Sequence, residues 1–302
     1  MSHPKSSHSR WLVLLLAWGW LLCAAGCHAL RLSQVSPDPV EKGPQPPAIA
    51  QKAEFRVGAQ FVFLPDFPIN QNLPLFRELA DLREQVYKEL QLPPSTTPIY
   101  VHLFESRDRY EQFMKATHPK LPRRRAFFVA QDYPLGGGEK LQVYTYWGER
   151  INQDLRHELT HALLHSVLKD VPLWLDEGLA EYFEMPPGWR GVNYQHVALL
   201  CRGPDGPCAP NLARLEEMTN EMMEKMTPAE YREAWGFVHL MLHSNAEARR
   251  VLLTYLRELR TNARPEPLRP RLAAVFSSPD QALARHLHNL DRTDPPATSA
   301  QR

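Results

Sequence analysis

The sequence lacks any surplus of charge: 35 Lys and Arg residues stand against 34 Asp and Glu residues, which gives a net charge of +1. Binding of nucleic acid or of a strongly charged partner depends on such a surplus, so the composition favours neither. A hydrophobic content of 43% with 23% charged residues is typical of a globular protein. A chain of 302 residues suits one domain or two small lobes.

The N-terminal region lacks an apolar run long enough to cross a membrane. Its run at residues 11–22 follows the basic residues Lys5 and Arg10 and is followed by the small residues of 23–27. A membrane-spanning helix needs about 20 apolar residues, whereas a short run in this setting is typical of an export signal. We therefore expect residues 1–27 to be a signal peptide.

The end of this segment, Ala24-Ala-Gly-Cys27, resembles a bacterial lipobox, in which Cys27 becomes the lipidated first residue. Ala24 stands where that motif prefers Leu, so ordinary signal-peptide cleavage nearby is the alternative. In either case we expect an exported protein of the bacterial cell envelope, lipid-anchored or otherwise periplasmic or secreted. It would meet the membrane only through that anchor, and the Pro-rich residues 28–52 would form a tether.

Cysteine is also scarce, with four residues in the chain. Cys23 is lost with the signal and Cys27 is lipidated or terminal, which leaves Cys201 and Cys208 on either side of a turn rich in Gly and Pro. In an oxidising compartment these two are expected to form a disulfide. A second metal site is the weaker interpretation, because no further Cys or His stands at ligand spacing.

The most informative pattern is H-E-x-x-H at residues 157–161, in a stretch whose apolar residues recur at helical spacing. On a helix, His157 and His161 lie one turn apart with Cβ atoms roughly 5–6 Å apart. Their imidazoles can then converge on one zinc ion. Glu158 stands beside the first ligand, where its carboxylate can take a proton from water on the metal.

A second block, W-L-D-E-G-L-A-E-Y-F at residues 174–183, is expected to form a largely buried helix. A zinc ion held by two histidines needs a third protein ligand and an open position, and Glu177 is the candidate for that ligand. Glu181, one turn later, is expected to accept the ring N–H of His157 and so fix its tautomer. Two solvated carboxylates are the alternative, but the apolar residues around them argue against it.

Together the two blocks resemble the gluzincin metallopeptidases, the group that contains thermolysin and the zinc aminopeptidases. The separation of His161 from Glu177 is a few residues shorter than in those two families and closer to small secreted bacterial gluzincin-like proteins. The sequence has no exopeptidase motif of the G-x-M-E-N type, so free N-termini are not implied as substrates. The metzincin pattern also fails, because Leu164 and Val167 stand where it needs Gly and His.

The resemblance implies an α+β, zincin-like fold for residues 53–290. A small N-terminal α/β lobe with a twisted sheet, residues 53–150, would precede a mainly helical lobe that begins with the H-E-x-x-H helix, residues 151–290. Residues 291–302 are expected to be a disordered tail. The resemblance further implies that the strand at residues 141–146 edges the cleft and pairs with an extended peptide.

Shorter patterns predict the elements of the first lobe. Strands are expected at residues 55–64 (one strand or a hairpin), 98–104, 126–130 and 140–146, and helices at residues 75–92 and 106–116. The basic run Arg123-Arg-Arg125 is expected to be a solvated turn rather than part of a substrate site. Further on, a capping box at residues 227–230 opens another helix.

Hydrolysis of a peptide bond needs a donor for the developing oxyanion besides the metal. Tyr231 is the candidate, because its setting resembles that of the aminopeptidase tyrosine that follows the third ligand. Tyr194 and His196 are its rivals. His165 and His239 are expected to be structural.

We therefore expect an exported zinc metallopeptidase with one zinc ion per chain. It would be an endopeptidase acting on a peptide or protein substrate and would bind no nucleic acid. The alternative is a catalytically inactive protein of the same fold that binds or scaffolds in the cell envelope. The presence of Glu158 argues against it, because a structural zinc site needs no base and closes its fourth position.

Overall fold

The computed structural model describes residues 54–133, 138–186, 188–203, 208–219 and 226–293. The expected signal peptide, Cys27, the tether at residues 28–52 and most of the expected disordered tail lie outside these ranges. Within them, no helix is long and apolar enough to cross a membrane.

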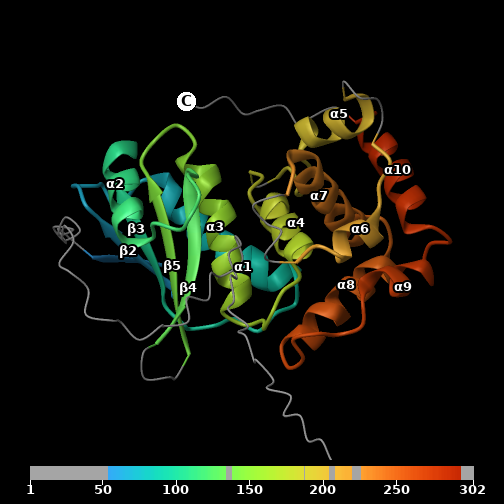
Figure 1. Cartoon of the computed structure of the whole chain (residues 1–302), viewed down its shortest axis with the longest axis horizontal. Coiled ribbons are helices and arrows are strands. Elements are labelled where there is room, and N and C mark those ends of the chain that lie inside the picture. The colour runs from blue at the N-terminus through green and yellow to red at the C-terminus, as the bar shows by residue number, and fades with distance from the viewer. Residues whose placement is uncertain (1–53, 134–137, 187, 204–207, 220–225, 294–302) are drawn as a thin grey trace, which may run out of the picture.

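The N-terminal half of the described chain is built on a mixed sheet of five strands in the order β1-β2-β3-β5-β4 (Figure 1). The strands are β1 (Phe55–Val57), β2 (Phe61–Pro65), β3 (Ile99–Phe104), β4 (Ala126–Asp132) and β5 (Glu139–Tyr146). β2, β3 and β5 run parallel, whereas β1 and β4 run antiparallel at the two edges. The stretch at residues 55–64 thus forms a hairpin, one of the two predicted forms, and the other predicted strands are confirmed to within two residues at either end.

The position of β5 corrects one expectation. Residues 141–146 belong to β5, which pairs with β3 on one side and with β4 on the other. Both sides of its backbone are therefore used within the sheet, and no extended peptide can pair with it. The free edge next to the following helix belongs to β4, which pairs only with β5 among the described strands.

Helices cover both faces of the sheet. α1 (Pro74–Glu89) and α3 (Ile151–His165) pack on one face and α2 (Arg107–Thr117), capped by Ser106, packs on the other. Figure 1 shows α2 and α3 on opposite sides of the sheet. Successive side chains of β4 point alternately to these two layers. Phe127 and Val129 join the core under α2, whereas Phe128 and Ala130 join the larger core shared with α3.

The remainder of the described chain is helical. It comprises α4 (Leu173–Phe183), α5 (Tyr194–Arg202), α6 (Leu212–Glu216), α7 (Pro228–His243), α8 (Ala246–Leu259), α9 (Leu268–Ala273) and α10 (Pro279–Leu290). The capping box predicted at residues 227–230 is present at the start of α7. With its mixed sheet and its many helices the chain is an α+β protein, as expected.

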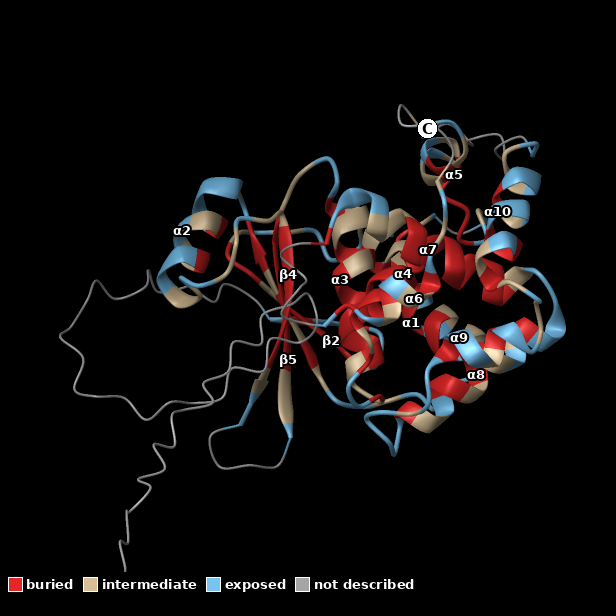
Figure 2. Cartoon of the chain, turned by 45° about the vertical axis from the view of Figure 1, so that its right-hand side comes forward, coloured by how far each residue is buried: buried red, intermediate tan, exposed pale blue. Residues whose placement is uncertain are grey.

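α4 is the most enclosed of these helices, since every residue in it except Glu181 is buried. Figure 2 shows the buried surfaces of α3, α4 and α7 gathered at the centre of the molecule. At Gly178 the helices α4 and α7 approach so closely that a Cβ atom would lie 2.6 Å from the carbonyl oxygen of Ala234. Glycine is therefore needed here because of space, and it lets α4 lie between α3 and α7.

The predicted disulfide is not formed, because Cys201 and Cys208 are both free thiols. Cys201 lies in the last turn of α5, and the backbone N–H of Cys208 donates to the carbonyl of Leu200 at 2.8 Å. This bond keeps the two residues near each other, but each thiol packs against the main hydrophobic core as a small apolar group. Burial raises the pKa of both thiols.

Candidate metal and catalytic site

The two motif histidines project from one face of α3. His157 and His161 are one turn apart, and their Nε2 atoms lie 3.3 Å from each other. The apolar residues Leu155, Leu159 and Leu163 of the same helix are fully buried in the core, which fixes how α3 is rotated. Burial of that stripe turns the histidines towards α4, as the spacing predicts.

α4 brings Glu177 to the same point. Its Oε2 atom lies 3.4 Å from Nε2 of His157 and 3.7 Å from Nε2 of His161. Ligand atoms that surround a tetrahedral zinc ion at about 2.0–2.1 Å are roughly 3.3 Å from one another. The three atoms are therefore spaced as three ligands of one small cation are, and these residues form a group able to hold a metal ion.

The state of Glu177 fits a bound cation. Its side chain is completely buried, and neither carboxylate oxygen accepts a well-formed hydrogen bond from the described residues. Burial alone would raise its pKa, but the rings of His157 and His161 hold the pKa well below its usual range. A buried, ionised carboxylate is costly unless a positive charge compensates it. Two imidazoles and such a carboxylate are also the donor set that zinc prefers.

The outer ring nitrogen of His157 is held by Glu184, not by Glu181 as expected. Nδ1 of His157 lies 3.0 Å from Oε2 of Glu184, and the amide of Gln153 donates to Oε1 of that carboxylate at 2.7 Å. Seven residues make almost two full turns of a helix, so Glu184 lies in line with Glu177, whereas Glu181 is rotated to one side. Glu181 instead lies 2.8 Å from Nε2 of His196.

His161 has its own partner, which the sequence did not lead us to expect. Nδ1 of His161 lies 2.9 Å from Oδ2 of Asp176, and the same oxygen lies 3.1 Å from Nε2 of His165. Asp176 is fully buried and directly precedes Glu177 in α4. It therefore orients the His161 ring with Nε2 towards Glu177, while His165 takes the structural role expected of it.

Glu158 lies beside His157 with 6% of its surface exposed. Its Oε2 atom is buried and has no hydrogen-bond partner among the described residues. Burial raises its pKa above the usual value for glutamate. A carboxylate with a raised pKa and one oxygen without a hydrogen bond is suited to accept and return a proton.

His157 and Glu158 open onto a cavity of about 380 Å³ between the start of β4, α3, α4 and α5. Its lining includes His196, but Tyr231 is not among the described residues that line it. Tyr231 is half-buried on α7 and packs against the hydrophobic core. Of the donors considered from the sequence, the structure thus brings His196 to the cavity that contains Glu158.

The basic run before β4 agrees with expectation in part. Arg123 is exposed, as a solvated turn requires, whereas Arg124 and Arg125 line the cavity. The guanidinium of Arg125 donates to Asp154 at 2.8 Å and lies over the ring of Tyr146. This ion pair links the residue before β4 to the first turn of α3.

Comparison with known proteins gives little beyond this geometry. A family model described as "Protein of unknown function (DUF1570)" matches residues 153–269. No curated protein matches the chain. Two solved structures of a mutant M1 zinc metallopeptidase from Deinococcus radiodurans are similar, the second of them bound to a Tyr-Ser-Ala substrate. Their sequence identities are 16% and 17% and their TM-scores 0.43 and 0.42, over 81% of this chain and 52% of each of those chains. The chain thus spans about half the length of those structures.

Proposed function

We propose that the chain is a zinc-dependent metallopeptidase of the gluzincin type that cleaves within peptide chains. The observation that carries the proposal is the convergence of His157, His161 and Glu177 on one point, with atoms 3.3–3.7 Å apart, next to the buried Glu158. A purely structural metal site has no need of the free carboxylate or of the adjoining cavity.

In this proposal His157, His161 and Glu177 hold the zinc ion, while Glu184 and Asp176 fix the two rings. A bound zinc ion supplies a Lewis acid that polarises a carbonyl and acidifies water. Glu158 accepts the proton released when water adds to the scissile carbonyl, and returns it to the leaving amine. His196 takes the role of oxyanion donor that the sequence assigned to Tyr231, because it lines the cavity with Glu158.

In this proposal the substrate peptide binds along the free edge of β4. An extended chain that pairs with an edge strand forms main-chain hydrogen bonds and needs no particular sequence to do so. β4 begins at Ala126, which lines the cavity together with Glu158. A peptide along this edge would therefore carry its main chain past the proposed base.

The test is the Glu158→Gln variant, with Glu247→Gln on the exposed surface of α8 as its control. A random peptide library is digested with zinc-loaded protein, and the products are identified by mass spectrometry. We expect Glu158→Gln to keep its zinc and to lose roughly 10²–10⁴-fold in rate, the usual contribution of a general base. The control should cleave like the parent.

Two outcomes would contradict the proposal. Equal cleavage by Glu158→Gln and the parent would show that Glu158 is not the base. A zinc-loaded parent that cleaves no peptide, although both proteins bind peptides equally well, would instead support a binding or scaffolding protein of this fold.

A further inference from the structure

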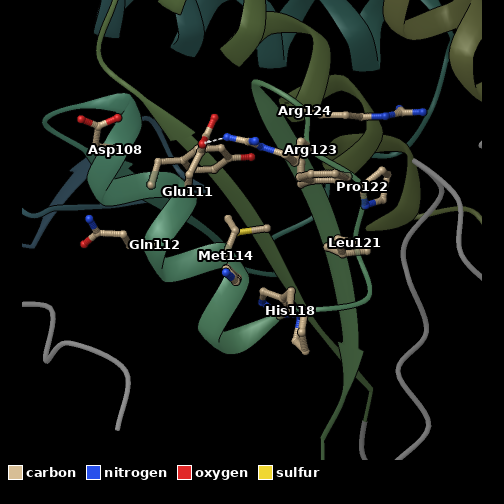
Figure 3. Close-up of a pocket in the computed structure, with 13 residues that line it drawn as sticks. Asp108, Glu111, Gln112, Met114, His118, Leu121, Pro122, Arg123 and Arg124 are labelled. Carbon is tan, nitrogen blue, oxygen red and sulfur yellow. Dashed lines mark hydrogen bonds and ion pairs between the residues drawn. The ribbon is translucent and has the colours of Figure 1, made fainter. Parts of the chain in front are cut away.

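A second cavity, of about 510 Å³, lies on the opposite face of the sheet, between α2 and the turn that leads into β4. Figure 3 shows Met114 of α2 and Leu121 of that turn on facing sides of it, with Arg123 reaching across to Glu111. Neither the candidate metal ligands nor Glu158 line this cavity. We call it the α2 pocket.

The α2 pocket adjoins the catalytic cavity at the start of β4. Arg124 lines both of them, and the next residues of the strand divide between the two, with Ala126 in the catalytic cavity and Phe127 in the α2 pocket. The four-residue segment 124–127 thus connects two cavities on opposite faces of the sheet.

Strand geometry predicts which side chains of a bound peptide would reach each of the two cavities. A peptide that pairs with the free edge of β4 extends the sheet by one strand, and its side chains alternate between the two faces. β4 itself shows the alternation, with Phe127 in the core under α2 and Phe128 in the core shared with α3. A substrate residue adjacent to one that faces Glu158 therefore directs its side chain to the α2 pocket.

Apolar side chains form one part of the pocket lining. Met114, Leu121, Pro122 and Phe127 contribute this apolar surface, and the charged residues Asp108, Lys115 and Arg124 also line the pocket. Two further charged residues, Arg123 and Glu111, form an ion pair with each other. A substrate side chain that covers the apolar part gains free energy, because apolar surface leaves water.

We propose that the α2 pocket is a specificity subsite that receives a large apolar side chain, aliphatic or aromatic, from a substrate residue close to the scissile bond. The proposal rests on the proposed function, since it requires a peptide that lies along β4 beside Glu158. It names the substrate class as peptides with such a residue at one fixed position.

The test separates binding from cleavage. Hexapeptide libraries with one fixed residue are passed over immobilised, zinc-loaded Glu158→Gln protein, and the retained peptides are identified by mass spectrometry. We expect one position at which Leu, Met or Phe is retained at least about tenfold better than Ala, since even a single methylene in an apolar pocket is worth about 10–200-fold. The variant Leu121→Trp, which fills the pocket, should lose this preference.

The matched control is Lys120→Trp, which adds the same bulk at the neighbouring exposed residue outside the pocket lining and should keep the preference. Leu121→Ala, which widens the pocket, should shift the preference towards aromatic residues. Thermal unfolding is measured for each variant, and an unfolding temperature equal to that of the parent shows that the variant is correctly folded.

The proposed subsite would be wrong if Leu121→Trp kept the apolar preference of the parent. It would also be wrong if the parent preferred charged residues. Digestion of the same libraries by the active protein tests hydrolysis separately. Absence of cleavage with the apolar preference intact would refute the proposed function and support the pocket as a peptide-binding site.

Discussion

α4 lies between two buried histidine clusters, and they differ in what surrounds the rings. On its α3 side, His157 and His161 meet the carboxylate of Glu177. On its α7 side, His239 and His243 stand with His286 of α10 against Tyr182. Each cluster combines fully buried and partly buried rings, yet only the first has the features of a ligand site.

The rings of the second cluster bond to one another and to Tyr182, although Nε2 of His239 has no hydrogen-bond partner among the described residues. Nδ1 of His239 lies 2.8 Å from Nε2 of His286, and Nε2 of His243 lies 2.8 Å from the hydroxyl of Tyr182. That hydroxyl donates to Glu89 at 2.5 Å. Of the described residues, the groups able to hold a metal ion all include His157, and none includes a member of this second cluster.

The histidine rings of the two clusters also differ in their pKa values and therefore in their charge. Burial lowers the pKa of His239 to about 2 and those of His243 and His286 to about 4, so these rings are neutral near pH 7. Burial also lowers the pKa of His161, but Asp176 and Glu177 raise it to about 10. The two clusters thus differ in the fully buried carboxylates of Asp176 and Glu177, which lie beside the rings of the first cluster.

Removal of metal should give the largest effect and should show which of the two clusters holds the ion. Dialysis against a chelator is expected to lower peptide hydrolysis by at least about a thousandfold, because the ion supplies several kcal/mol of transition-state stabilisation. Zinc added back should restore the activity. The variant His286→Gln should respond to both treatments like the parent, and loss of chelator sensitivity in it would place the metal at the second cluster.

The partners of the ligand rings give the next largest effect. Glu184→Gln should weaken zinc binding about 10–100-fold, because Glu184 orients the ring of His157. Glu181→Gln, which removes the carboxylate that faces His196, should change zinc affinity much less. Competition with a fluorescent zinc chelator measures both. A larger effect of Glu181→Gln would restore the assignment made from the sequence.

The spacing between the clusters depends on Gly178. Gly178→Ala places a methyl group 2.6 Å from the carbonyl oxygen of Ala234 on α7, the helix that carries His239. We expect a loss of about 3 kcal/mol in the free energy of unfolding, the upper end for overpacking. Urea unfolding measures it, with Gly148→Ala as the control, because its nearest neighbour is 3.8 Å away. Equal stability of the two variants would contradict the close packing.

The neutral cluster should make the fold sensitive to acid. Its histidines have a lower pKa in the folded protein than the usual 6.5, so the unfolded chain binds more protons and stability falls as the pH drops from about 6.5 to about 4. For the buried His239 this amounts to about 2 kcal/mol at pH 5. His286→Gln should lose less stability than the parent between pH 7 and pH 5 in urea unfolding. An identical loss in both proteins would show that the cluster does not titrate.

Local patterns predicted the part of the site that lies on one helix face. The four-residue spacing of His157 and His161 and the buried character of residues 174–183 both placed their side chains correctly. The i+7 relation between Glu177 and Glu184 was present in the sequence and could have identified the partner of His157. The one-turn spacing of Glu181 from Glu177 favours Glu181 instead when the sequence alone is considered.

What the sequence could not supply depends on tertiary geometry. Which strand lies at the edge follows from how β4 turns back on β5, and no periodicity in residues 126–146 encodes it. The free thiols of Cys201 and Cys208 likewise depend on which way each side chain packs. The sequence named His196 as a rival to Tyr231 but could not rank the two, because the approach of His196 to the cavity requires α5 to fold back beside α4.

The most direct test of the account is the zinc content of purified protein, measured by mass spectrometry for the parent, Glu177→Ala and His243→Gln. We expect about one zinc ion per chain in the parent and in His243→Gln, and almost none in Glu177→Ala. Zinc retained by Glu177→Ala, or lost from His243→Gln alone, would contradict the assignment of the metal site to α3 and α4.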